Sequence, residues 1–142
     1  MGINSRMDEI QAAITSVNLL HIADGNRERQ EIARKYSEGI KNKAVMTPSI
    51  RPNTEHVFHV FPLLCDNRDR MHGYLESAGI HTQIHYPIPC HLAECYRNLG
   101  YEVGQIPQAE YYAAHELSLP IYVGLKEEEI DYIITTINEF HG

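Results

Sequence analysis

Residues 57–65 read VFHVFPLLC, a run of β-branched, aromatic and aliphatic side chains. Such residues favour an extended, half-buried backbone, so the run predicts a β-strand. A second strand is predicted at 80–86, IHTQIHY, and a short third strand at 117–122, LSLPIY. Three short strands make only a small sheet, which we expect to be mostly antiparallel and covered by helices on one face.

The first third of the chain predicts a long helix or a pair of helices. Apolar residues recur there at helical spacing and form one stripe: Met7, Ile10, Ile14, Val17 and Leu20. Asn4 or Ser5 is the expected N-cap, and a break or kink is expected at 24–26 before the pattern resumes and runs to Lys43. Because this segment has more surface than so small a sheet can cover, we expect part of it to pack on something outside the chain.

Three further segments predict helices. A turn and a short helix are expected within 66–79, ending at a glycine, with Met71, Tyr74, Leu75 and Ala78 facing inward. Residues 108–116 are also expected to be helical, and 125–140 predict a helix whose inward stripe is Ile130, Ile133, Ile134, Ile137 and Phe140. The predicted fold is therefore α+β, with a long N-terminal helix, a small three-stranded sheet and a C-terminal helix.

The composition fits one domain of this kind and argues against several classes of protein. The 142 residues are 43% hydrophobic and carry a formal net charge of −7, which disfavours a nucleic-acid or anionic-membrane surface. Cys65, Cys90 and Cys95 form no CxxC pair and leave one cysteine over from any disulfide, which favours the reducing cytoplasm. The sequence predicts neither a signal peptide nor a transmembrane helix.

Nine histidines raise the question of a metal site, but their spacing disfavours one. His81 and His85 share one face of a predicted strand and lie roughly 13 Å apart along it, too far to bind one ion. His85 and His91 would converge only if the intervening loop folded back. Cys90 and Cys95 lie near His91, yet nothing beside them supplies an orienting group, so we favour small half-buried side chains over a thiol nucleophile.

Residues 80–91, IHTQIHYPIPCH, carry the strongest chemical signal. Prolines 87 and 89 lock the backbone where the predicted strand ends, so His85, Tyr86 and His91 are presented from a rigid loop. Imidazole and phenol groups placed in this way hydrogen-bond hydroxyls or phosphate oxygens. A strand-end turn with aromatic packing explains the same residues equally well.

Asn4, Ser5 and Arg6 lie where the first helix is expected to begin. The free N–H groups of a helix start attract anions, and an amide and a guanidinium beside them suit a phosphate. A plain N-cap with a surface arginine is the simpler interpretation of these residues taken alone.

Five ordered stretches resemble the pyridoxal-phosphate-dependent sugar aminotransferases of the DegT/DnrJ/StrS group. They are GINSRMDEIQAAI (2–14), VFHVFPL (57–63), AGIHTQIHYPIPCH (78–91), LGY…P.AE (99–110) and ELSLPIY (116–122). The resemblance runs from Gly2 to Phe140 and implies the small α/β C-terminal domain of the aspartate-aminotransferase fold. Residues 1–142 would be that single domain, with 1–43 as the linking helix region and the large cofactor-binding domain absent from this chain.

The resemblance also implies an activity and a set of site residues. Family members are homodimers that use pyridoxal phosphate to move an amino group, from glutamate, to a nucleotide-linked keto-sugar for amino-sugar and polysaccharide biosynthesis. Carried across, Asn4 and Arg6 would contact the cofactor phosphate, and His85, Tyr86 and His91 would lie at the sugar site. The form HYPIPCH favours the C3 ketone over C4. We expect a cytoplasmic protein with no nucleic-acid or membrane partner.

None of the four lysines resembles the Schiff-base motif of the family: Lys35, Lys41, Lys43 and Lys126. Transamination requires that lysine, so we expect no catalytic residue in this chain and no turnover by the chain alone. The alternative is a non-catalytic truncated module kept for dimerisation or regulation, with the first helix as its contact surface.

Overall fold

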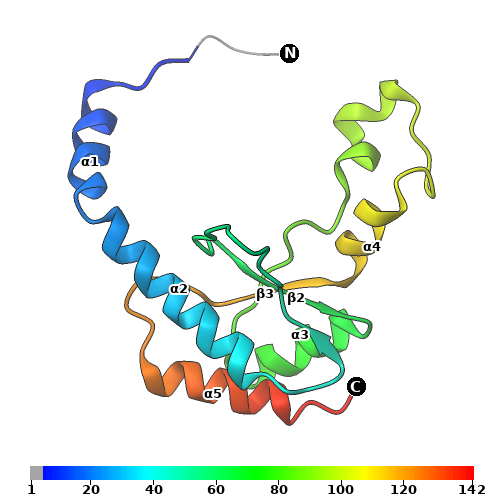
Figure 1. Ribbon diagram of the computed structural model, residues 1–142. Helices are drawn as coiled ribbons and strands as arrows, with labels where there is room; N and C mark the ends of the chain where they lie inside the picture. The colour runs from blue at the N-terminus through cyan, green and yellow to red at the C-terminus, as the bar shows by residue number, and fades with distance from the viewer. Residues whose placement is uncertain (1–4) are drawn as a thin grey trace.

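The computed structural model describes residues 5–142, which form a small antiparallel sheet with helices packed against one face (Figure 1). The elements are, in chain order, α1 (Glu9–Leu19), α2 (Ile22–Gly39), β1 (Val45–Met46), β2 (Phe61–Cys65), α3 (Arg68–Ser77), the 3-10 helices η1 (Cys90–Leu92) and η2 (Glu94–Leu99), α4 (Pro107–His115), β3 (Glu116–Leu119) and α5 (Glu127–Asn138). The predicted α+β class is confirmed.

The sheet has the order β1-β2-β3 and two chemically different faces. Along β2 and β3 the opposed residues are Phe61 and Leu119, Pro62 and Ser118, Leu63 and Leu117, and Leu64 and Glu116. Residues directly opposite each other share a face, and successive residues alternate between faces. The face of Phe61, Leu63 and Leu117 meets the helices, whereas the other face carries Ser118 and Glu116.

β1 is short and pairs with β2 only at Leu64 and Cys65. Opposite Pro62 the ladder is therefore open on the β1 side. On the other side of β3, both backbone groups of Ser118 are bonded to Gln83, with N–H···O distances of 2.7 and 3.2 Å. Pro62 and Ser118 consequently form a pair without hydrogen bonds between them.

The number of strands agrees with the sequence analysis, but their identity does not. The predicted strand at 80–86 is reduced to a single bridge between Gln83 and Ser118, and Val45–Met46, which was not predicted, supplies the third strand. Carboxylates explain the loss, because the backbone N–H of Thr82 donates to Glu76 and that of His85 donates to Glu116. These amides are therefore not available to a neighbouring strand.

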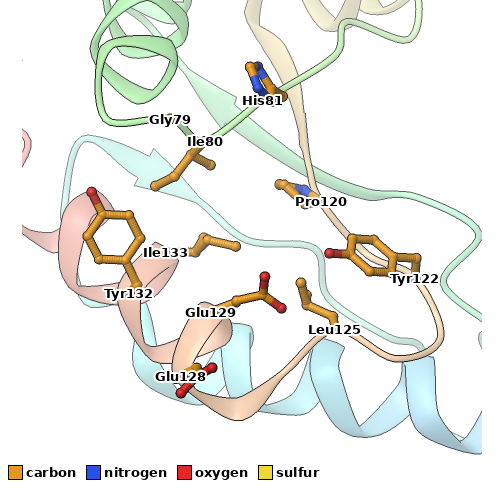
Figure 2. Close-up of a pocket in the computed structure, with 10 residues that line it drawn as sticks. All are labelled: Gly79, Ile80, His81, Pro120, Tyr122, Leu125, Glu128, Glu129, Tyr132 and Ile133. Carbon is orange, nitrogen blue, oxygen red and sulfur yellow. The ribbon is translucent and has the colours of Figure 1, made fainter.

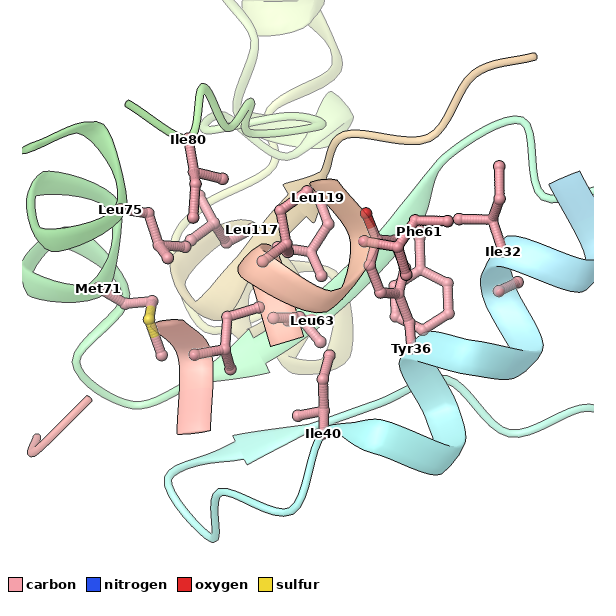
Figure 3. Close-up of a cluster of buried hydrophobic side chains, with 14 of the residues drawn as sticks. Ile32, Tyr36, Ile40, Phe61, Leu63, Met71, Leu75, Ile80, Leu117 and Leu119 are labelled. Atoms are coloured by element: carbon pink, nitrogen blue, oxygen red, sulfur yellow. The ribbon is translucent and has the colours of Figure 1, made fainter. Parts of the chain in front are cut away.

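The core lies between the sheet and the helices α2, α3 and α5 (Figure 3). Tyr36 of α2 packs on Phe61 with ring centroids 5.2 Å apart, and both side chains are fully buried. The Tyr36 hydroxyl donates to the carbonyl oxygen of Pro120 at 2.8 Å, and burial raises its pKa. The predicted inward residues of α3 and α5 are confirmed as core or core-packing residues: Met71, Leu75, Tyr74, Ala78, Ile130, Ile133, Ile134, Ile137 and Phe140.

The predicted cap and break of the first helices are wrong. Asp8 is the N-cap of α1, accepting from the backbone N–H of Gln11 at 2.8 Å, so Ser5 does not have that role, and Asn4 lies outside the described residues. The break falls at Leu20–His21, and α2 continues through 24–26. The Gly25 N–H donates to the His21 carbonyl oxygen at 3.0 Å, as in a continuous helix. The helix therefore persists here, although Asp24, Gly25 and Asn26 are residues typical of turns.

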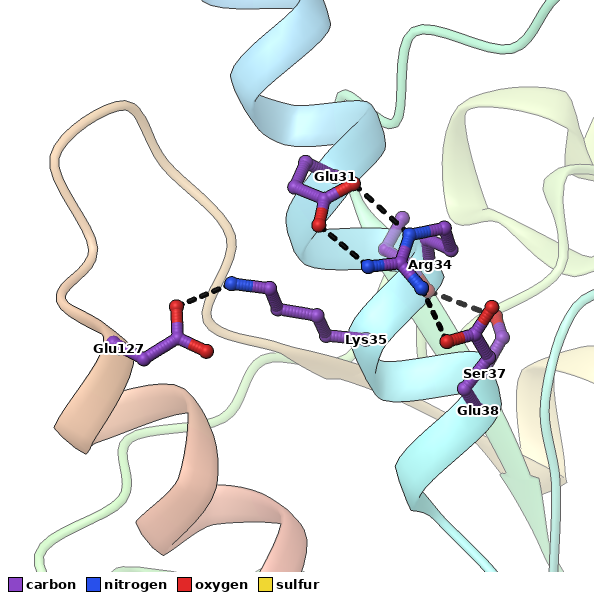
Figure 4. Close-up of polar contacts among 7 residues, drawn as sticks. Glu31, Arg34, Lys35, Ser37, Glu38 and Glu127 are labelled. Carbon is purple, nitrogen blue, oxygen red and sulfur yellow. Dashed lines mark hydrogen bonds and ion pairs between the residues drawn. The ribbon is translucent and has the colours of Figure 1, made fainter.

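α1 extends from the start of α2 away from the sheet (Figure 1), and none of its residues is buried. α2, in contrast, is tied to the rest of the domain. Figure 4 shows Arg34 between Glu31 and Glu38 on the helix surface, and Lys35 reaching across to Glu127 at the start of α5. The Arg34 guanidinium lowers the pKa of Glu31.

Within residues 5–142 there is no helix that combines the length and the apolar character needed to cross a bilayer.

Candidate functional site

His85 lies at the end of the bridge to β3, on the sheet face opposite the helical core. Its backbone N–H donates to Glu116 Oε2 at 2.6 Å, and its Nδ1 lies 3.0 Å from Ser118 Oγ. Ser118 Oγ in turn lies 2.5 Å from Glu116 Oε1. Glu116 and Ser118 are 6% and 4% exposed, so a buried carboxylate and a buried hydroxyl hold a half-buried imidazole in place.

Tyr86 stands beside this imidazole but faces solvent. Its side chain is 72% exposed, and its ring meets that of His85 edge-on with centroids 5.4 Å apart. The structure therefore brings together two of the predicted site residues, one fixed from behind and one open.

Two pockets flank His85. One, of about 620 Å³, is lined by polar groups that include Thr82, Gln83 and Ser118. The other, of about 460 Å³, lies against the outer face of the sheet and includes Tyr112. His85 lines both pockets, so its ring is accessible to a ligand in either.

A carboxylate on α3 organises the rim of the larger pocket. Glu76 accepts from the backbone N–H of Thr82 and from Nδ1 of His81, both at 2.9 Å, and the first of these bonds is the main reason that its pKa is lowered. His72 Nδ1 lies 2.6 Å from the Thr82 hydroxyl. Residues 5–142 contain no cluster of three His, Cys, Asp or Glu side chains placed to hold a metal ion.

His91 is placed elsewhere. Its side chain is 5% exposed, and its Nε2 lies 3.1 Å from Glu110 Oε1. Glu110 also accepts from the backbone N–H groups of Gly104, at 2.9 Å, and Ile106, at 3.3 Å, and these bonds together with His91 lower its pKa. His91 lines neither pocket beside His85, and it fastens the segment that carries η1 and η2 to α4.

Arg6 is exposed and precedes α1. The predicted anion site at this helix start is altered by Asp8, whose carboxylate already takes the Gln11 N–H. Because α1 extends away from the sheet (Figure 1), the structure does not bring Arg6 together with His85. Asn4, its predicted companion at the cofactor phosphate, lies outside the described residues.

No lysine lines either pocket beside His85. Lys35 pairs with Glu127, and Lys126 pairs with Glu128 at 3.8 Å. A cofactor held as a Schiff base needs an amine inside its pocket. The described residues beside His85 alone therefore do not fit pyridoxal phosphate held as a Schiff base.

A further pocket, of about 550 Å³, lies between the turn at Gly79, the segment after β3 and the start of α5 (Figure 2). Tyr122 and Tyr132 stand on opposite sides of it, and the Tyr132 hydroxyl donates to the Ala78 carbonyl at 3.0 Å. The predicted site residues do not line this pocket. Sequence analysis also missed Glu116 and Ser118, for which the only available signal was two polar residues alternating with leucines in ELSL.

Comparison with known proteins gives one consistent match. The model of the DegT/DnrJ/EryC1/StrS aminotransferase family matches residues 1–138. The erythromycin biosynthesis sensory transduction protein EryC1 of Saccharopolyspora erythraea is 41% identical over 137 residues, covering 96% of this chain and 37% of that protein. The dTDP-3-amino-3,6-dideoxy-α-D-galactopyranose transaminase of Aneurinibacillus thermoaerophilus is 37% identical over 139 residues, covering 98% of this chain and 38% of that protein.

Solved structures agree with the sequence comparison. The crystal structure of DesV from S. venezuelae superposes with a TM-score of 0.92 at 34% identity, covering 97% of this chain and 38% of that one. The chain thus spans a little over a third of the length of the proteins it matches.

Proposed function

Since the chain belongs to the DegT/DnrJ/EryC1/StrS aminotransferase family, we propose that it is the C-terminal small domain of a sugar aminotransferase. The family depends on pyridoxal phosphate. In our proposal the complete enzyme is a cytoplasmic homodimer that transfers an amino group from glutamate to a nucleotide-linked keto-sugar. The remainder of the enzyme supplies the Schiff-base lysine, and this chain supplies part of the sugar site.

One observation carries the proposal: an accessible imidazole, clamped by buried Glu116 and Ser118, stands beside an exposed phenol at a polar pocket. Burying a carboxylate is costly unless it is hydrogen-bonded, and here Glu116 accepts from the backbone N–H of His85 and from the Ser118 hydroxyl, which itself contacts the His85 ring. The exposed ring of Tyr86 has room for a second ligand contact. This arrangement suits a polyhydroxylated ligand, which offers several hydroxyls to orient.

The bound cofactor supplies an electrophilic ring that accepts and releases the amino group. The residues of this chain do not perform that chemistry. We propose that His85 and Tyr86 bind and orient the sugar, and that Asn4 and Arg6 reach the cofactor phosphate of the neighbouring subunit. For His91 the contact with Glu110 favours an indirect role, in which it holds the η1–η2 segment in place.

The proposed substrate carries its ketone at C3. The form HYPIPCH, residues 85–91, favours that position, and the Aneurinibacillus relative is named for a 3-amino sugar. The nucleotide and the remaining sugar substituents are not part of the proposal.

A chimaera tests the proposed function. Residues 1–142 replace the corresponding C-terminal part of the Aneurinibacillus transaminase, and the product is assayed with pyridoxal phosphate, glutamate and that relative's keto-sugar nucleotide. We expect turnover by the chimaera, none by the 142-residue chain alone, and a strong loss of kcat/KM in the His85→Ala chimaera. A chimaera that folds and binds cofactor but transfers no amino group contradicts the proposal, as does turnover by the isolated chain.

A second candidate is a non-catalytic assembly or regulatory module. It is favoured by the uncovered apolar side of α1, which would then be its contact surface. The chimaera separates the two candidates, because an assembly module has no reason to restore amino transfer.

A further inference from the structure

Glu116, Ser118 and His85 form a hydrogen-bond chain whose protons can be counted. Glu116 Oε2 accepts from the backbone N–H of His85 at 2.6 Å, an amide that can only donate. Ser118 Oγ lies between Glu116 Oε1, at 2.5 Å, and His85 Nδ1, at 3.0 Å. Because Glu116 and Ser118 are both buried, water does not compete for these contacts.

When the Glu116 carboxylate is ionised, the hydrogens of this chain can be placed in only one way. An ionised carboxylate only accepts hydrogen bonds, and a serine hydroxyl has a single hydrogen to donate. The Ser118 hydrogen therefore goes to Glu116 Oε1, and Ser118 Oγ must accept from His85 Nδ1. In a neutral imidazole one nitrogen carries the hydrogen and the other a lone pair. His85 Nε2, which has no hydrogen-bond partner among residues 5–142, then holds the lone pair.

Building on the proposed function, we propose that Glu116 and Ser118 are positioning residues that hold neutral His85 in its Nδ1–H form and so make Nε2 an acceptor for a sugar hydroxyl. An ionised phosphate oxygen also only accepts, so it gains nothing from such a nitrogen. The arrangement selects the hydroxyl-bearing part of a nucleotide-sugar over its diphosphate. From sequence alone, both ligand groups were open to this histidine.

The tautomer is measurable in the chain without substrate or cofactor. Histidine labelled with ¹⁵N is introduced, and long-range ¹H–¹⁵N correlations are recorded at a pH of about 8.5, where imidazoles are neutral and carboxylates are ionised. His85→Gln identifies the resonances. We expect protonated Nδ1 and bare Nε2 at His85, and a neutral His85 protonated at Nε2 overturns the proposal.

Variants show whether the neighbours cause the tautomer. Ser118→Ala is expected to shift His85 towards the Nε2–H form, while Ser118→Thr keeps the hydroxyl and the Nδ1–H form. Ser37→Ala, which removes an exposed serine hydroxyl that donates to the Ala33 carbonyl far from His85, is the control and should change nothing. If Ser118→Ala unfolds, Glu116→Gln, which preserves the shape of the side chain, should also reduce the Nδ1–H population. An unchanged tautomer in a folded Ser118→Ala or Glu116→Gln chain contradicts the proposal.

Ligand selection is tested in the active chimaera. Ser118→Ala should raise KM for the sugar nucleotide roughly tenfold, the effect of one lost hydrogen bond, and leave inhibition by the free nucleoside diphosphate unchanged. Equal weakening of both ligands overturns the assignment of His85 to the hydroxyls. The tautomer measurement does not depend on amino transfer, so an inactive chimaera would count against the proposed function and leave the tautomer result standing.

Discussion

Replacing Ile10 and Ile14 by glutamate should convert the 142-residue chain from a dimer to a monomer. The stripe predicted on the first helix is uncovered by the described residues, with its side chains between 59% and 77% exposed: Met7, Ile10, Ile14, Val17 and Leu20. Burial of such a continuous apolar face is favourable in water, so we expect it to bind a partner. In the isolated chain, the available partner is a second copy.

The structure allows the strength of this contact to be worked out. Burying the exposed part of each of these side chains contributes roughly 1.5 kcal/mol, hence roughly 15 kcal/mol for the five side chains of both copies. Association opposes this with roughly 8 kcal/mol of lost translational and rotational freedom. The remaining roughly 7 kcal/mol corresponds to a Kd on the order of 10 µM. Removing both isoleucines from each copy takes away roughly 6 kcal/mol and moves the Kd above about 0.1 M.

Sedimentation equilibrium across a concentration series is the assay. The control is Gln11→Glu combined with Thr15→Glu, which adds the same charge to neighbouring polar positions of α1 and should leave the dimer intact. Circular dichroism verifies that both double variants keep their helices. A wild-type chain that stays monomeric at about 100 µM, or a control that dissociates as fully as Ile10→Glu with Ile14→Glu, would refute the reasoning.

Three further outcomes are expected. Leu63→Ala should lower the free energy of unfolding by about 3–5 kcal/mol, and Leu64→Ala, on the outer face of β2, by about 1 kcal/mol; equal losses in urea titrations would contradict the two-face assignment. Asn138→Ala removes side-chain bonds that join the ends of α2 and α5 and should destabilise by about 1–3 kcal/mol in the same titration, with no change as the contrary result. The pKa of Glu110 is lowered in the folded state, so its ionised form stabilises the fold above the ordinary glutamate pKa of about 4.3. This stabilisation is lost as the pH falls through the folded-state pKa. The Gly104 loop should therefore lose hydrogen-exchange protection on acidification from about pH 4.5 to 3. In Glu110→Gln that protection should already be weak at neutral pH, and full protection would speak against the Glu110 contact.

The parts of the fold that sequence predicted are those specified by local signals. The helix ending at Gly79 and the helix rich in isoleucine at the C-terminus follow from apolar periodicity and a positive φ of 76° at that glycine. The strand expected at 80–86 failed because two carboxylates outside that segment, Glu76 and Glu116, accept from its backbone amides. Nothing within the segment itself announces those partners.

In the candidate site, too, sequence indicates the residues with a local signal and misses those whose contacts depend on the fold. His85 and Tyr86 could be proposed from the sequence because the prolines beside them restrict the backbone, which is a local property. Their supports were missed, since Glu116 and Ser118 lie in a strand whose polar positions suggest a solvent-exposed face, whereas the structure buries them. His91 and Glu110 are separated by 19 residues, and only the fold of the intervening loop makes them a pair.

Pro62 has a consequence for how copies of this chain meet. Since both backbone groups of Ser118 turn towards Gln83, the backbone of Pro62 turns the opposite way, towards the gap left where β1 stops at Met46. A foreign strand approaching that gap meets a ring nitrogen with no hydrogen to share. Pairing of a second sheet edge-to-edge is thereby disfavoured at this point of the sheet border.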